Sequence, residues 1–106
     1  MNKFSFLLIS LGLIFSCHSE KEVSFNNDIK PIINIKCISC HGGVKKTAGF
    51  SLLFHEEALA NTDEGSPAII PGNSKKSRLI QRLHETDLEL RMPFEKPALS
   101  KDEISL

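Results

Sequence analysis

The chain has 106 residues, which limits it to one small domain. Its 13 basic and 13 acidic side chains give a formal charge of zero, so composition indicates neither nucleic-acid binding nor an acidic disordered tail. With no Trp, no Tyr and 7 Phe, a hydrophobic core of this size is marginal unless a metal, a disulfide or a cofactor supports it.

The N-terminal segment has the pattern of an export signal. An apolar run over residues 4–15 follows Lys3, and it is too short to span a bilayer comfortably. A buried helix is the alternative, but the run is apolar on all faces and follows a basic start. The segment resembles a bacterial lipoprotein signal, in which Cys17 becomes the lipidated first residue. Phe15 departs from that signal, which prefers a small residue there, so plain secretion with cleavage nearby stays open.

These features predict a signal peptide over 1–16, a polar tether over 17–23 and a domain over 24–106. The mature protein is expected in the periplasm or at the outer membrane. Lipidation at Cys17 would supply more than one acyl chain, which is what stable membrane anchoring requires.

The first helix of the domain is predicted over 24–37. Its apolar residues recur at helical spacing, Asp28 is the expected N-cap, and Pro31 falls in the first turn, where its missing N–H costs no internal hydrogen bond. A strand is the competing prediction, because the stretch is rich in isoleucine. A second, short helix is expected somewhere within 50–60.

The rest of the domain alternates turns with helices. Residues 61–73 form a turn-rich crossing, and a helix over 75–85 follows, with Asn73 or Ser74 as its cap. Two prolines keep 90–99 extended. Ser100 and the glutamate three residues later make a capping box that starts a last helix. The predicted fold is therefore all-α.

The stretch CISCHGG, residues 37–43, leaves several chemical readings open. A redox C-x-x-C pair normally follows a strand in a βαβ pattern, and no such pattern is visible. A disulfide between Cys37 and Cys40 would close a very short loop. A zinc site would need a further ligand from His55 or His84 in addition to the motif.

The pattern C-x-x-C-H is the signature of covalent c-type haem attachment. Thiols at Cys37 and Cys40 can add to the two vinyl groups on one edge of a porphyrin, because one helical turn presents both sulfurs along that edge. His41 then supplies the proximal imidazole to the iron. The export signal supports this reading, since such haems are attached outside the cytoplasm. We therefore expect haem c, with its iron, as the cofactor.

Met92 is the predicted distal ligand. It is the only methionine after the initiator, it precedes a proline on a constrained loop, and a His/Met pair suits electron transfer. His84 is the rival and would give a bis-His haem, whereas His55 and His18 are interpreted as surface or tether residues. Arg91 is a candidate partner for a haem propionate, or else a solvated loop charge.

The assembled motifs resemble the planctomycete-type cytochrome c domain over residues 25–106. By that likeness Cys37 and Cys40 carry the haem, His41 is proximal and Met92 distal. The family continues through a C-terminal helix that begins where this sequence ends, so the resemblance implies a fragment of a longer polypeptide. The motifs that carry the resemblance are FNNDIKPI (25–32), CISCHG (37–42), KK…GFSL (45–52), IPGN…SRLI (70–80), RMP (91–93) and LS…EI (99–104).

The resemblance implies one-electron transfer with redox partner proteins, for which Lys45 and Lys46 are candidate docking charges. No acid–base or substrate-binding constellation is visible, so the chain is expected to be an electron carrier and not an enzyme by itself. Two alternatives stay open: an electron-feeding module of a larger multidomain oxidoreductase, and a zinc-binding lipoprotein.

Overall fold

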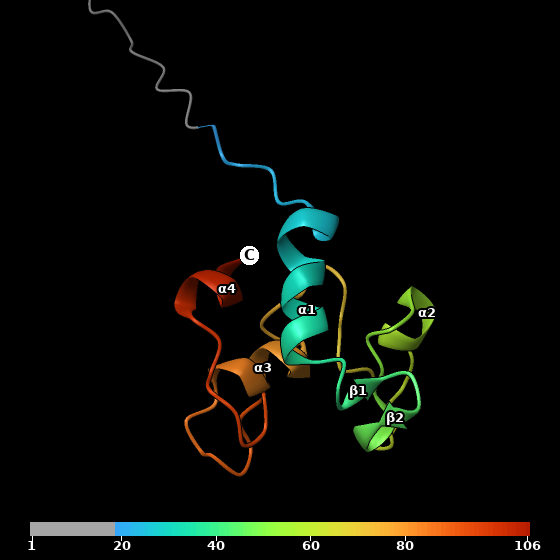
Figure 1. Cartoon of the computed structure of the whole chain (residues 1–106). Helices are drawn as coiled ribbons and strands as arrows, with labels where there is room; N and C mark the ends of the chain where they lie inside the picture. Colours follow the sequence, from blue (N-terminus) through green and yellow to red (C-terminus); the bar gives the residue numbers. More distant parts are fainter. Residues whose placement is uncertain (1–18) are drawn as a thin grey trace, which may run out of the picture.

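The computed structural model describes residues 19–106. The predicted signal peptide, the proposed lipidation residue Cys17 and His18 lie outside this range. Residues 19–24 lead without regular structure into the folded part of the chain, where short helices are joined by long turns (Figure 1). No helix within residues 19–106 has the length and apolar character needed to cross a membrane.

The first helical segment is a π-helical turn, Phe25–Ile29, that continues directly into α1, Lys30–Lys36. Ser24 caps it, because its hydroxyl accepts from the Asn27 N–H while its own N–H donates to the Asp28 carboxylate at 2.8 Å. Asp28, the expected cap, instead accepts a hydrogen bond from the backbone N–H of Ser24. The two side chains thus each satisfy one backbone N–H group at the start of the helix, as in a capping box.

The prediction of an all-α fold is wrong. Strands β1, His41–Gly42, and β2, Lys45–Lys46, form an antiparallel hairpin in which His41 pairs with Lys46. Gly43 in the turn has φ +59°, a left-handed conformation that glycine adopts at no steric cost. The glycines after the C-x-x-C-H motif thus end the helical turn and reverse the chain, and a single 3-10 turn, Thr47–Gly49, follows.

The remaining helices are α2, His55–Ala58, α3, Arg78–His84, and α4, Lys101–Ser105. The capping box of α4 is confirmed. Helix α3 begins three residues later than predicted because the preceding segment is held in turns. Ser77 is 3% exposed, and its hydroxyl bonds to both the N–H and the carbonyl of Ile70.

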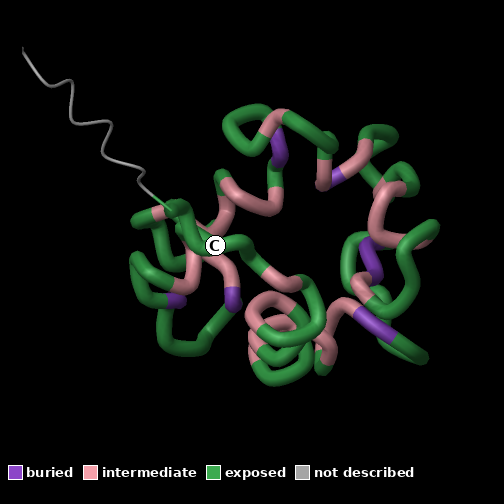
Figure 2. The backbone as a smooth tube through the Cα atoms, turned by 90° about the horizontal axis from the view of Figure 1, so that it is seen from above, coloured by how far each residue is buried: buried purple, intermediate pink, exposed green. Residues whose placement is uncertain are grey.

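The apolar core of the described residues is small and consists of Phe50, Ala68 and Leu99. Seen from above, the buried segments are scattered around the molecule and the backbone surrounds its centre (Figure 2). So few buried side chains provide little hydrophobic stabilisation for a domain of this size. The elements are arranged around a central cavity instead of a large apolar core.

Candidate functional site

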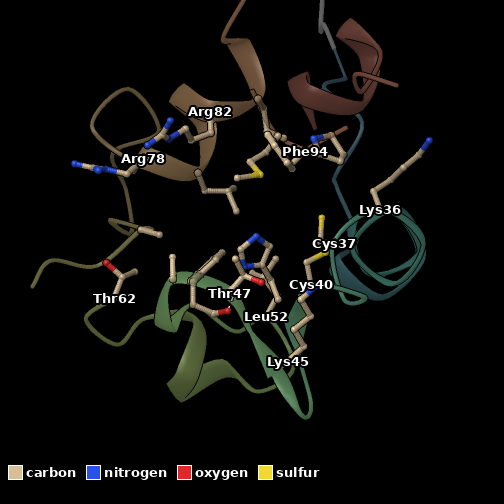
Figure 3. A pocket seen from close by; sticks show the side chains of 18 of the residues that line it. Lys36, Cys37, Cys40, Lys45, Thr47, Leu52, Thr62, Arg78, Arg82 and Phe94 are labelled. Carbon is tan, nitrogen blue, oxygen red and sulfur yellow. Dashed lines mark hydrogen bonds between the residues drawn. The ribbon is translucent and has the colours of Figure 1, made fainter. Parts of the chain in front are cut away.

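A cavity of about 320 Å³ lies between α1, the β-hairpin, α3 and the loop that follows α3. Cys37, Cys40, His41 and Met92, the residues predicted to hold a haem, all line it. Figure 3 shows Cys37 and Cys40 together on one wall. Most of the surface inside the cavity is apolar, and the larger apolar residues of the lining are Phe50, Leu52, Leu79, Leu83, Pro93 and Phe94.

One turn of chain at the end of α1 presents the two thiols. The N–H of Cys37 donates to the carbonyl of Ile33 at 2.9 Å, and the N–H groups of Cys40 and His41 both donate to the carbonyl of Cys37, at 3.2 and 2.9 Å. This turn places both sulfurs on the same wall. Burial raises the pKa of the Cys37 thiol, the opposite of the lowered pKa that activates a redox cysteine.

His41 is oriented by the segment that follows the hairpin. Its Nδ1 lies 3.3 Å from the carbonyl oxygen of Phe50, and its ring packs against the Phe50 ring at a centroid distance of 5.4 Å. A carbonyl oxygen only accepts, so this hydrogen bond requires the proton on Nδ1 and leaves the lone pair on Nε2. Histidines that bind metals commonly have this arrangement, with the second nitrogen donating to a backbone carbonyl.

Met92 is held against α3 by its backbone. Its N–H donates to the carbonyl of Arg82 at 3.0 Å, and the following Pro93 is buried. The same loop also reaches the cysteine turn, because the Lys96 ammonium donates to the hydroxyl of Ser39 at 3.2 Å. Two contacts thus connect the methionine loop to α3 and to the cysteine turn.

The structure does not bring every candidate residue to the cavity. His84 is the exposed last residue of α3, His55 is exposed at the start of α2, and neither lines the cavity. Arg91 is also outside the lining; its Nη2 donates to the carbonyl of Lys96 at 3.0 Å, and its buried Nε has no hydrogen-bond partner among the described residues.

Two arginines that sequence reasoning overlooked, Arg78 and Arg82, do line the cavity. Their spacing of four residues, which places them on one face of a helix, was the only available signal. It did not reveal which face the cavity would adjoin.

The donor set and the walls fit a covalently bound haem. The site offers two thiols, an imidazole with a directed nitrogen and a thioether, inside an apolar cavity at the centre of a fold that lacks a large core of its own. Within residues 19–106, no three His, Cys, Asp or Glu side chains are grouped to hold a metal ion directly. The zinc alternative therefore gains no support from the described part of the chain.

The donor set and the apolar walls suit a small haem-binding electron-transfer domain of the cytochrome c type. Residues 37–95 match the family described as Planctomycete cytochrome C, and the chain belongs to this family. The match confirms the resemblance noted in the sequence. No curated protein and no solved structure matches the chain.

Proposed function

We propose that the protein is a one-electron carrier whose haem is attached through Cys37 and Cys40, with His41 and Met92 as axial ligands. The observation that supports this most strongly is the convergence of these residues on one apolar cavity, although Met92 comes from a loop far from the C-x-x-C-H motif in sequence. Bound there, a haem iron supplies a one-electron couple between its ferrous and ferric states.

Each residue has a defined part in this proposal. Cys37 and Cys40 hold the cofactor by thioether bonds and prevent its loss from a small domain. The Phe50 carbonyl keeps the Nε2 atom of His41 available, because it fixes the proton on Nδ1. The Arg82 carbonyl fixes the backbone of Met92, and the apolar walls limit the access of water to the iron.

A thioether ligand raises the reduction potential relative to an imidazole or water, and axial ligation can move haem potentials over about 0.8 V. Met92→Ala should therefore convert a low-spin haem to high spin and lower its potential. His84→Ala is the matched comparison, since it removes the rival ligand from an exposed position outside the cavity.

Visible absorption spectra of the ferric and ferrous proteins, together with a potentiometric titration, measure both effects. A spin-state change in His84→Ala without one in Met92→Ala would indicate a bis-His haem. If neither variant changes spin state, the sixth position is open or holds water, and the electron-carrier proposal loses its ligand set.

A further inference from the structure

The wall of the cavity that faces the two cysteines carries two arginines. Arg78 and Arg82 reach this wall from α3, and Figure 3 shows them on the side away from Cys37 and Cys40. They are four residues apart, so their side chains leave the same face of the helix. Two guanidinium groups therefore border the end of the cavity that faces the cysteines, and Lys36, Lys45 and Lys96 are the other basic residues of its lining.

Contacts with neighbouring segments hold both arginines in place. Nη1 of Arg82 donates to the carbonyl of Leu90 at 3.2 Å, and Nη1 of Arg78 pairs with the carboxylate of Glu64, which also lines the cavity. A guanidinium has five N–H donors in a fixed fork, so each group retains donors for another acceptor after these contacts. Two arginines and one glutamate leave this end of the cavity with an excess of positive charge.

The chemistry of the porphyrin identifies the acceptor. In haem, the two vinyl groups that react with cysteines stand on one edge, and the two propionate carboxylates stand on the opposite edge. Thioether bonds to Cys37 and Cys40 would fix the vinyl edge at their wall. The carboxylates would then be directed to the opposite wall, where a planar guanidinium can bind a carboxylate through two parallel hydrogen bonds.

We propose that Arg78 and Arg82 bind the two propionate carboxylates of the haem, a role for which the sequence had offered only Arg91 as a candidate. The inference rests on the proposed haem site. It also assigns Arg82 two contacts at once, since its backbone carbonyl fixes Met92 while its side chain holds a carboxylate. Helix α3 thereby couples the propionate end of the cofactor to its distal ligand.

The test uses the haem-loaded protein made in a host that attaches c-type haem. Arg78→Gln and Arg82→Gln remove one charge each, and Arg82→Lys retains the charge but not the planar fork. Lys76→Gln is the matched control, because Lys76 is exposed, lies just before α3 and does not line the cavity. Arg91→Gln tests the rival position.

Covalent haem content is measured first, by the pyridine haemochrome spectrum. If the wild-type protein carries no covalent haem, the proposed function is wrong, independently of the role of the arginines. With haem attached, we expect both glutamine variants to lower the reduction potential, because a cation near the haem favours the less positive ferrous state. The resonance Raman bands of propionate bending should shift in the same variants and not in Lys76→Gln.

In Arg82→Lys the reduction potential should stay close to that of the wild type, because the positive charge is retained. Its propionate Raman bands should be shifted almost as far as in Arg82→Gln, because lysine lacks the planar fork. The two measurements therefore separate the effect of charge from that of bidentate geometry. Unchanged potentials and Raman bands in both glutamine variants would overturn the proposal, as would a Raman shift confined to Arg91→Gln. If a glutamine variant does not load haem, the Arg82→Lys variant is used in its place. Raman bands identical to those of the wild type in Arg82→Lys would also overturn the proposal.

Discussion

Replacing Gly49 by alanine should destabilise the wall of the cavity more than the same change at another left-handed glycine. Gly49 has φ +69°, and a Cβ there would overlap Oδ1 of Asp63 and lie 2.9 Å from its Cγ. The N–H of Asp63 donates to the carbonyl of Ala48 at 3.0 Å, so the two loops meet backbone to backbone at this point. Ala48 on one loop, and Thr62 and Glu64 on the other, line the cavity.

The matched variant is Gly65→Ala, because Gly65 has φ +81° but a Cβ added there would meet no atom within 4 Å. The left-handed backbone alone costs about 1–2 kcal/mol in each variant. For a domain of this size that corresponds to a melting temperature lower by about 4–16 °C. The loss of unfolded-state freedom on changing glycine to alanine is common to both variants and cancels in the comparison.

Thermal unfolding followed by circular dichroism measures the difference. Gly49→Ala should melt below Gly65→Ala, because the added Cβ displaces the Asp63 carboxylate and lies 3.0 Å from the Asp63 backbone nitrogen. Asp63→Ala in the Gly49→Ala background should recover the part of that excess that comes from the carboxylate. Equal melting temperatures for the two single variants would refute the reasoning, since they would show that the Asp63 contact has no effect.

Three further outcomes are expected. The pKa of Glu57 is lowered by hydrogen bonds from Lys46 and Ser51, so its stabilising effect is present above the unfolded pKa and is lost as pH falls through the folded pKa. The melting temperatures of wild type and Glu57→Gln should therefore approach each other as the pH falls below the unfolded-state pKa of glutamate, about 4.3. Phe50→Leu retains the carbonyl that orients His41 but loses the stacked ring and core volume, so thermal unfolding should begin at a lower temperature while the haem stays low-spin. Cys17→Ser should move the protein from the membrane fraction to the soluble fraction, and an unlipidated wild-type N-terminus in mass spectrometry would contradict the anchoring hypothesis.

Local chemistry determined which parts of the fold were predictable. The capping box of α4 was found because Ser100 and Glu103 satisfy each other within one turn. The hairpin was missed because strands of two residues are too short to show an alternating pattern, and the turn depends on one glycine. The late start of α3 depends on contacts between Ser77 and Ile70, a turn interaction that helix periodicity does not report.

The candidate site also contains residues that the sequence could predict and residues that it could not. The chemistry of covalent haem attachment fixes the spacing of Cys37, Cys40 and His41, so the sequence alone predicted that one turn would present both thiols. The backbone hydrogen bonds of Cys40 and His41 to Cys37 form such a turn. The arginines could not be assigned, because sequence does not show which face of a helix adjoins a cavity made by other segments. Arg91 was a candidate because a guanidinium can bind a carboxylate through two hydrogen bonds, yet Arg91 does not line the cavity and its Nη2 donates to the carbonyl of Lys96.

Covalent attachment of a haem through Cys37 and Cys40 can be measured by the intact mass of the denatured protein after export in a host that attaches c-type haem. We expect a mass equal to the mature chain plus one haem, and the loss of that increment when both cysteines are replaced by serine. Ser39→Ala is the control, because it alters the same turn but retains both thiols. A wild-type mass equal to that of the chain alone would exclude covalent haem attachment.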